Sequence, residues 1–88
     1  MDVLYTKQFS KDISRIKDKR LKDKIFATIQ EVKGSKTILE ISHLKKIKNH
    51  KNTFRIKIGN YRLGIYLFGN VIEFARFVHR KDIYRYFP

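Results

Sequence analysis

The chain has no cysteine and only eight acidic residues among 88. Without cysteine it has neither a disulfide framework nor a thiolate that binds a metal or acts as a nucleophile. Its three histidines lack zinc-ligand spacing with nearby carboxylates, so we expect no metal site and no cofactor. There is also no signal-peptide core and no apolar run long enough to span a bilayer, which predicts a cytoplasmic protein.

The shortage of acidic residues leaves a strongly cationic chain. Twenty-one lysines and arginines give a formal net charge of +13 and a pI of about 10.2. Between Ile41 and Ile72 there is no aspartate or glutamate at all, so positive charge is concentrated in this stretch. Self-repulsion on this scale works against an isolated compact monomer and favours an anionic partner, either nucleic acid, an acidic protein or an anionic membrane surface.

Two Gly-Asn pairs, at 59–60 and 69–70, separate three runs of β-branched and aromatic residues. The runs are 54–58, 61–67 and 71–78, and a Gly-Asn pair between such runs is the signal of a two-residue hairpin turn. The sequence therefore predicts a three-stranded antiparallel meander.

Turns of two residues also fix how these strands pair. Side chains alternate between the two faces of a strand, so the pairing sorts the residues into an apolar face and a partly cationic face. Arg76 is the one charged residue expected on the apolar face. The expected cross-strand pairs are Lys57 with Arg62, Arg55 with Gly64, Tyr66 with Glu73, and Gly64 with Ala75.

The cationic face combines positive charge with small residues. Lys57 and Arg62 are expected directly opposite one another, and a bound anion would offset their repulsion. Gly64 and Ala75 would leave a shallow floor beside them. Antiparallel sheets commonly turn one polar face to water, but three cations next to such a floor favour a phosphate-binding groove. We assign to this groove face Arg55, Lys57, Arg62, Gly64, Tyr66, Phe68, Val71, Glu73, Ala75, Phe77 and His79, and to the core face Phe54, Ile56, Ile58, Tyr61, Leu63, Ile65, Leu67, Ile72, Phe74 and Val78.

The residues before the meander predict an edge strand and two helices. Val3–Tyr5 is a short apolar run suited to the edge of the sheet. Thr6 is suited to cap a first helix, whose exposed side includes Asp12. A second amphipathic helix is expected from about Leu21 to Lys33, with Gly34 as the stop after it. Two helices lying on a membrane are a weaker alternative, because the apolar sheet face needs a cover from within the chain.

Residues 35–52 are expected to be an exposed basic loop, tied to the core by apolar residues that include Leu39. Its lysines are suited to contact phosphates of a nucleic-acid backbone, or they belong to a solvated connection. In residues 79–88, aromatic and basic side chains alternate. This pattern fits stacking on bases beside phosphate contacts, and equally fits a tail held to the domain by its aromatics.

Together these elements predict an α+β fold. Its order is an N-terminal strand, a helical hairpin, and an antiparallel three-stranded meander with the helices packed on one face. A chain of 88 residues has room for one modest core, so we expect residues 1–88 to form a single domain.

Two segments give a family resemblance. The run FRIKIGNYRL at residues 54–63, followed by HRKDIY at residues 79–84, resembles the RelE/ParE toxin superfamily of bacterial type II toxin–antitoxin systems. The order of the expected elements is similar as well, over essentially the whole chain. The resemblance implies a toxin that is neutralised by a co-encoded acidic antitoxin in a hetero-oligomeric complex.

For the RelE-like branch, the resemblance implies a metal-independent mRNA endonuclease that blocks translation and that acts either on the ribosome, as we expect, or on free mRNA. In such enzymes the 2′-hydroxyl of the RNA attacks the adjacent phosphate and leaves a 2′,3′-cyclic phosphate. Two alternatives remain open: a ParE-like inhibitor of DNA gyrase with the same fold, and an RNA-binding module without catalysis. For catalysis the resemblance implies Arg55, Lys57, Arg62, Arg80 and Tyr84, with Glu73 and His79 as further acid–base candidates. The basic loop and the C-terminal segment add Lys45, Lys46, Lys48, Lys51, Lys81 and Arg85 as candidates for contacts with RNA or the ribosome.

Overall fold

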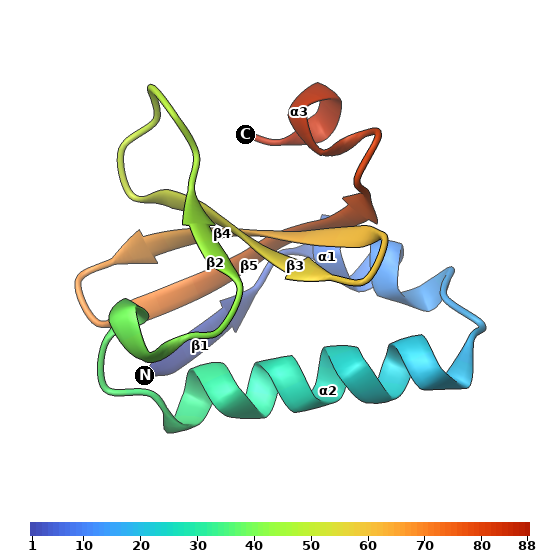
Figure 1. The fold of residues 1–88 in the computed structure, drawn as a ribbon, viewed down its shortest axis with the longest axis horizontal. Helices are drawn as coiled ribbons and strands as arrows, with labels where there is room; N and C mark the ends of the chain where they lie inside the picture. The colour runs from blue at the N-terminus through green and yellow to red at the C-terminus, as the bar shows by residue number, and fades with distance from the viewer.

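The structure, a computed structural model that describes residues 1–88, is organised around one five-stranded sheet. Its elements are β1 (Asp2–Tyr5), α1 (Lys7–Ser14), α2 (Lys19–Gly34), the 3-10 helix η1 (Ile38–Glu40), β2 (Leu44–Lys46), β3 (Thr53–Ile58), β4 (Tyr61–Phe68), β5 (Val71–His79) and α3 (Ile83–Tyr86). The strand order is β1-β5-β4-β3-β2, with β1 parallel to β5 and the other neighbours antiparallel. Helix α2 runs along one face of the sheet, and α3 lies on the opposite face (Figure 1). The expected α+β fold is confirmed.

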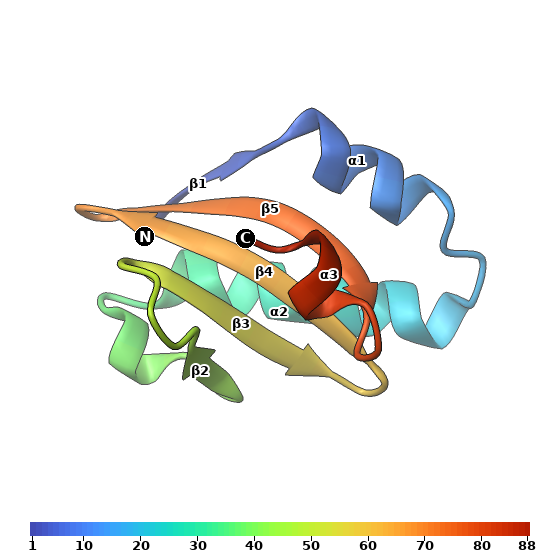
Figure 2. The same cartoon turned by 90° about the horizontal axis from the view of Figure 1, so that it is seen from above.

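The two long helices begin at capping residues. Thr6 caps α1 by accepting a hydrogen bond from the amide of Phe9 at 2.9 Å, as expected. Asp18 caps α2 by accepting from the amide of Arg20 at 2.9 Å, so this helix begins two residues before the expected Leu21. Gly34 is the last residue of α2 and does not follow it. Viewed from above, α1 lies alongside β5 while α2 passes behind the sheet (Figure 2).

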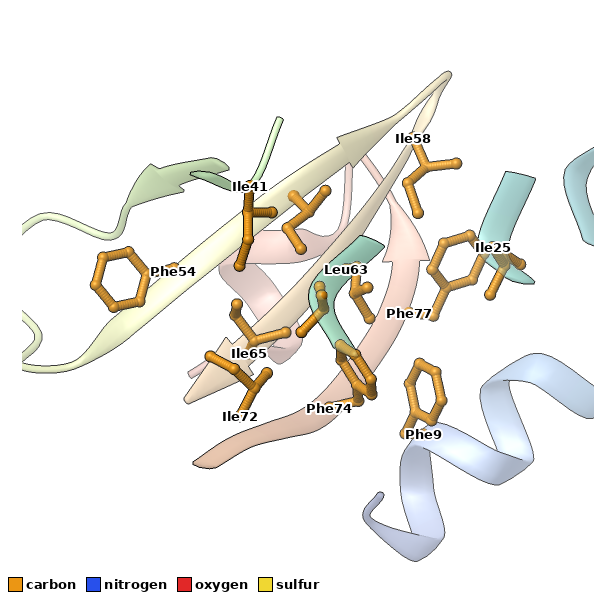
Figure 3. Packing of buried hydrophobic residues seen from close by; sticks show 12 residues of the cluster. Phe9, Ile25, Ile41, Phe54, Ile58, Leu63, Ile65, Ile72, Phe74 and Phe77 are labelled. Atoms are coloured by element: carbon orange, nitrogen blue, oxygen red, sulfur yellow. The ribbon is translucent and has the colours of Figure 1, made fainter. Parts of the chain in front are cut away.

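The main core fills the space between the sheet and these two helices (Figure 3). From α1, Phe9 packs on Phe74 of β5 with ring centroids 5.6 Å apart. From α2, Ile25 and Val32 are buried against the sheet. Full burial of such a side chain contributes about 1.5–3 kcal/mol relative to exposure. The twelve buried residues of the core are Phe9, Ile25, Val32, Ile41, Phe54, Ile56, Ile58, Leu63, Ile65, Ile72, Phe74 and Phe77.

The expected basic loop contains a strand that the sequence did not indicate. Leu44–Lys46 pairs with β3 as the outermost strand β2, so the sheet has five strands and the loop is shorter. A strand of three residues is too short to show an alternating pattern. Leu39, expected to anchor the loop, is 91% exposed.

A second cluster of buried residues covers the middle of the groove face, on the opposite side of the sheet from α2. We call it the tail cluster, because two of its four members come from the C-terminal segment. It closes the open floor expected at Gly64, where an added Cβ would lie only 2.6–2.8 Å from three ring atoms of Phe87. The members are Ile47, Ala75, Ile83 and Phe87.

The expected strand pairing is confirmed in the β3–β4 hairpin, including Lys57 opposite Arg62, and in the half of the β4–β5 hairpin nearest its turn. It is wrong at Gly64, which faces Arg76 instead of Ala75. The cause is a β-bulge, in which two residues of one strand oppose a single residue of its neighbour.

Beyond the bulge, the side chains of β5 exchange faces relative to the expected arrangement. Phe77, expected in the groove, is 2% exposed and belongs to the main core. Val78, expected in the core, packs against the tail cluster. His79 pairs with Tyr61, whose ring stacks on Phe77, so the histidine leaves the groove face. Arg76 turns out of the core.

Contacts from α1 and its cap explain the bulge. The hydroxyl of Thr6 donates to the carbonyl oxygen of Ala75 at 2.8 Å. The carboxylate of Asp12 accepts the amide of Phe77 at 2.9 Å and forms an ion pair with Arg76. The bulge takes these backbone groups out of the regular hydrogen bonding between strands, and Thr6 and Asp12 supply the hydrogen bonds instead. Asp12, expected on the exposed side of the helix, is only 5% exposed.

No helix in the structure is both long and apolar enough to cross a membrane.

Candidate active site

The expected catalytic cations gather around the turn between β3 and β4. Lys57 and Arg62 face each other across this hairpin, and Arg55 lies two residues before Lys57 on the same face. The C-terminal segment reaches the same turn, because the amide of Arg80 donates to the carbonyl oxygen of Asn60 at 2.8 Å. We call Arg55, Arg62 and Arg80 the arginine cluster.

Arg62 lies at the electrostatic centre of this cluster. Its pKa is lowered, first by partial burial and then by the positive charges of Arg55 and Arg80, while Tyr84 acts weakly in the opposite direction. Arg55, Arg80 and Tyr84 therefore each lie within electrostatic range of Arg62. A guanidinium still keeps its proton at neutral pH, so the site carries concentrated positive charge.

No carboxylate neutralises the cluster. The two ion pairs of the structure join Lys19 to Asp23 on α2, and Arg76 to Asp12 between β5 and α1. Uncompensated like charges at close range raise the free energy of the folded chain. A bound anion would remove this cost, so the turn between β3 and β4 is suited to bind one.

Arg62 keeps free donors for such an anion. Its Nη1 donates to the carbonyl oxygens of Gly59 at 3.0 Å and Tyr61 at 2.9 Å. A guanidinium carries five N–H groups, so those on Nε and Nη2 are still available. Their fork geometry fits two oxygens of one phosphate.

The C-terminal segment is held to the domain by some of its side chains and leaves another one exposed, so it is suited to both roles that the sequence left open. Ile83 and Phe87 are each 2% exposed and hold the segment on the sheet. Tyr84 lies on α3 between them and is 71% exposed. Its hydroxyl and ring therefore remain accessible beside the arginine cluster.

A cavity of about 480 Å³ separates the basic loop from the C-terminal segment. Lys46 closes part of the loop by donating from Nζ to the carbonyl oxygen of His50 at 3.0 Å. Lys45 lines this cavity and pairs with Arg55 across β2 and β3, so the cavity and the arginine cluster form one continuous basic surface. The lining residues are Lys45, Lys46, Ile47, Lys48, His50, Tyr84, Phe87 and Pro88.

His50 was not expected at this surface, because nothing in its sequence neighbours distinguishes it from an ordinary turn histidine. Lys51, which was expected to bind RNA, lies exposed in the same loop but does not line the cavity. Its position still leaves it at the edge of the basic surface.

The structure does not bring the acid–base candidates to the arginine cluster. Glu73 pairs with Tyr66, four residues along β4 from Arg62, which is about 13 Å at the rise of a strand. The ring of Phe87 lies between, with its centroid 5.1 Å from that of Tyr66. His79 lies on the core side, where its Nδ1 accepts the amide of Lys81 at 3.2 Å.

Arg85 lies away from the cavity. Its guanidinium carbon is 5.6 Å from the ring centroid of Tyr86, and Arg76 approaches the same ring at 5.3 Å. This contact is on the side of the segment that faces Asp12 and α1. Of the residues expected to contact RNA, Lys45 pairs directly with Arg55 of the arginine cluster, and Lys46 and Lys48 line the same cavity as Lys45. Lys81 is exposed and directly follows Arg80 in the chain.

Comparison with known proteins places this site in a family. Residues 3–84 match the family described as ParE toxin of type II toxin-antitoxin system, parDE. Over 89 aligned positions the chain is 40% identical to Toxin RelE3 of Methanocaldococcus jannaschii, and the alignment covers 100% of both proteins.

Solved structures agree with this relationship. A chain in the crystal structure of the RelB–RelE antitoxin–toxin complex from Methanococcus jannaschii is 39% identical and superposes with a TM-score of 0.82, over 97% of this chain and 99% of that one. The E. coli DinJ–YafQ complex matches with a TM-score of 0.64 over 94% and 97% of the chains, but at 17% identity it supports the fold alone. The chain therefore belongs to the ParE toxin family of type II toxin–antitoxin systems and is a RelE-like toxin of the RelE/ParE superfamily.

Proposed function

We propose that this toxin is a metal-independent endoribonuclease that cleaves mRNA on the ribosome and so blocks translation. The observation that carries the proposal is the arginine cluster, which has no neutralising carboxylate and lies beside the exposed hydroxyl of Tyr84. Cleavage of RNA passes through a phosphorane with more negative charge than the starting phosphate, and fixed cations stabilise that charge.

The RNA supplies its own nucleophile in this reaction. The 2′-oxygen forms a bond to the adjacent phosphorus, and the bond from phosphorus to the 5′-oxygen breaks. The products are a 2′,3′-cyclic phosphate and a 5′-hydroxyl, so one proton leaves the 2′-oxygen and one reaches the 5′-oxygen. The protein needs to orient the strand, stabilise the phosphorane and move these protons.

The geometry supports a division of these tasks. Arg62, with two sets of free N–H groups, grips the phosphate oxygens, while Arg55 and Lys57 stabilise the added charge from the neighbouring strand. Arg80 approaches from the C-terminal segment. Tyr84 carries an exposed side chain within electrostatic range of Arg62 and is the residue that we assign to proton transfer, since Glu73 lies on the far side of Phe87.

Lys45, Lys46 and Lys48 extend the basic surface away from the cleavage site. We assign them to the phosphates of the flanking RNA or of the ribosome, with Lys51, Lys81 and Arg85 at the edge. Contacts of this type raise affinity without reading sequence.

We also assign an antitoxin partner. The similar chain from Methanococcus jannaschii is described in complex with the antitoxin RelB. A net charge of +13 favours an acidic antitoxin in a hetero-oligomeric complex, which lowers the self-repulsion of the toxin.

The test is to induce the protein in bacteria and map mRNA 5′ ends. New ends within translated frames are expected for the wild type and for Arg20→Ala, a matched loss of one arginine from α2. They are expected to be absent with Arg62→Ala. Ends that persist with Arg62→Ala, or that are missing with the wild type, contradict the proposal.

A second candidate function is ParE-like inhibition of DNA gyrase, which the match to the ParE toxin family favours. It predicts growth arrest with intact mRNA and with breaks in chromosomal DNA. RNA that is bound but not cut would instead indicate an RNA-binding module without catalysis.

A further inference from the structure

The C-terminal segment crosses the groove face and is fastened to the sheet at two points. At its start, the amide of Arg80 donates to Asn60 at 2.8 Å. Near its end, Phe87 lies directly on Gly64 of β4, where an added Cβ would come within 2.6–2.8 Å of three atoms of the ring. Between these points α3 passes over β4 and β5 (Figure 2).

The match between Gly64 and Phe87 is specific. Only a residue without a side chain leaves room for the ring at this distance. Phe87 is 2% exposed, and its ring also contacts Tyr66, with centroids 5.1 Å apart. We call this arrangement the Phe87 seat.

The Phe87 seat lies next to the arginine cluster. Gly64 follows Arg62 by two residues on the same face of β4, a distance of about 7 Å. Tyr84 precedes Phe87 by three residues, about one turn of the α3 helix. Tyr84 is thus held between two fastening points that both lie close to Arg62.

Beyond Arg80, a further contact with the sheet is that of Arg76 in β5 with the ring of Tyr86, at 5.3 Å, on the side of the segment away from Tyr84 and the cavity. The backbone hydrogen bonds of Arg85, Tyr86 and Phe87 are made to Asp82 and Ile83 within the same segment. None of these bonds reaches the sheet. Of the residues of this segment, Ile83 and Phe87 are the ones buried on the groove face, so the position of Tyr84 between them depends mainly on their packing in the tail cluster.

We propose that Phe87 is a positioning residue, which by packing on Gly64 holds the hydroxyl of Tyr84 beside Arg62. The consequence for catalysis rests on the proposed ribonuclease function. The position of Tyr84 does not rest on it, and the two are measured separately.

Two variants remove the Phe87 seat from opposite sides. Gly64→Ala places a methyl group where the ring lies, and Phe87→Ala removes the ring without changing the sheet. Gly34→Ala is the matched control for the first, because nothing lies within 4 Å of the Cβ added there. Phe26→Ala is the control for the second, because this phenylalanine is 65% exposed on α2.

The first measurement uses NMR and needs no RNA. In the wild-type background, Tyr84→Phe is expected to shift the Nε–Hε resonance of Arg62, because the two side chains are close. In the Gly64→Ala and Phe87→Ala backgrounds the same change is expected to leave that resonance unmoved. Amide exchange at Tyr86 and Phe87 is expected to become at least tenfold faster, while the amides of β4 away from residue 64 stay protected.

A size exchange separates positioning from a general loss of stability. In the double variant Gly64→Ala with Phe87→Leu, the smaller and more flexible side chain leaves room for the added methyl. We expect this variant to regain the effect of Tyr84→Phe on Arg62. If the two changes instead destabilised the fold independently, the double variant would be less stable than either single variant and would not regain the effect.

The second measurement is cleavage of mRNA on ribosomes. Gly64→Ala and Phe87→Ala are expected to lower kcat by about the same factor as Tyr84→Phe, with little change in KM. Adding Tyr84→Phe to either variant is expected to lower kcat no further. Loss of a general acid or base typically costs about 10²–10⁴-fold.

Three results decide between the two proposals. If Gly64→Ala and Phe87→Ala both leave the tail amides protected, or if Tyr84→Phe still shifts Arg62 after the tail is released, Phe87 does not position Tyr84. If both variants cleave with the wild-type kcat, its role in catalysis is overturned. If the NMR coupling is found but the wild type cuts no RNA, the proposed ribonuclease function fails while the positioning of Tyr84 stands.

Discussion

Asp12 and Arg76 lie 64 positions apart in the chain and meet in a two-pronged ion pair. Oδ2 of Asp12 is 2.9 Å from Nε of Arg76, and Oδ1 is 3.3 Å from Nη2. The same carboxylate accepts the amide of Phe77, so one side chain on α1 fastens both the bulge in β5 and the strand beyond it.

This pair makes stability depend on acid pH. Burial by itself would raise the pKa of Asp12, but hydrogen bonds from Arg76, Phe77 and Gln8 outweigh it and hold the pKa below its ordinary value. A lowered pKa contributes stability that is complete above the unfolded value of about 3.9 and is lost as pH falls through the folded value. We expect the urea midpoint of the wild type to fall below pH 4, where that of Asp12→Asn changes less.

At neutral pH, Asp12→Asn is expected to lower the free energy of unfolding by about 3 kcal/mol, since it leaves a partly buried Arg76 without its counter-ion. Urea unfolding followed by circular dichroism measures this loss. The matched control is Asp23→Asn, whose ion pair with Lys19 is exposed on both sides and is expected to contribute below about 1 kcal/mol. Equal losses for the two variants would contradict the structural role of Asp12.

Thr6 is expected to stabilise the fold through two different bonds. Its hydroxyl accepts from Phe9 as a helix cap and donates to Ala75 at the bulge. Thr6→Val keeps the shape of the side chain but loses both bonds, at a cost of about 2 kcal/mol in the free energy of unfolding. Thr6→Ser keeps both bonds, and its thermal unfolding is expected to stay within a few degrees of the wild type. An unchanged midpoint for Thr6→Val would contradict this assignment.

The sequence predicts this fold well where local patterns determine structure. Gly59 and Gly69 both adopt positive φ in their turns, 58° and 59°, as the two-residue hairpins require. The bulge could not be predicted in the same way. Its cause is a carboxylate on α1, and no local pattern links Asp12 to a strand more than sixty residues later.

In the candidate site, the bulge separates the residues whose positions were predicted correctly from those whose positions were not. Arg55, Lys57 and Arg62 precede the bulge in the pairing scheme, so turn geometry alone puts them together. His79 lies beyond the bulge and changes face. Gly64 was correctly recognised as a position where a side chain is missing, but the space is filled by Phe87 from the end of the chain.

The basic loop is expected to bind RNA through charge. Replacing Lys45 and Lys48 by Met removes two cations while keeping most of the apolar stem of each side chain. For a single strand, the slope of log K against log salt is negative, and each lost phosphate contact reduces its magnitude by about 0.7, so we expect the slope to become less steep by about 1.4. Binding of an RNA with a 2′-deoxy cleavage site, titrated over a range of salt, measures the slope without cleavage. Lys11 and Lys33 replaced in the same way are the control, and an equal decrease there would contradict a specific role for the loop.

Arg62 is expected to act through its shape as well as its charge. Arg62→Lys keeps one positive charge opposite Lys57 but loses the planar fork, and a single ammonium does not hold two phosphate oxygens in a fixed plane. We expect the rate of mRNA cleavage to fall by about 10²-fold, the scale of one lost donor to a developing negative charge. The same substitution at Arg20 on α2 is expected to leave the rate unchanged. Because the side chain of Arg62 makes only two hydrogen bonds, both to its own turn, the free energy of unfolding of Arg62→Lys is expected to stay within about 1 kcal/mol of the wild type. A wild-type cleavage rate in a folded Arg62→Lys variant would mean that charge alone is sufficient, and that the fork of Arg62 does not grip the phosphate.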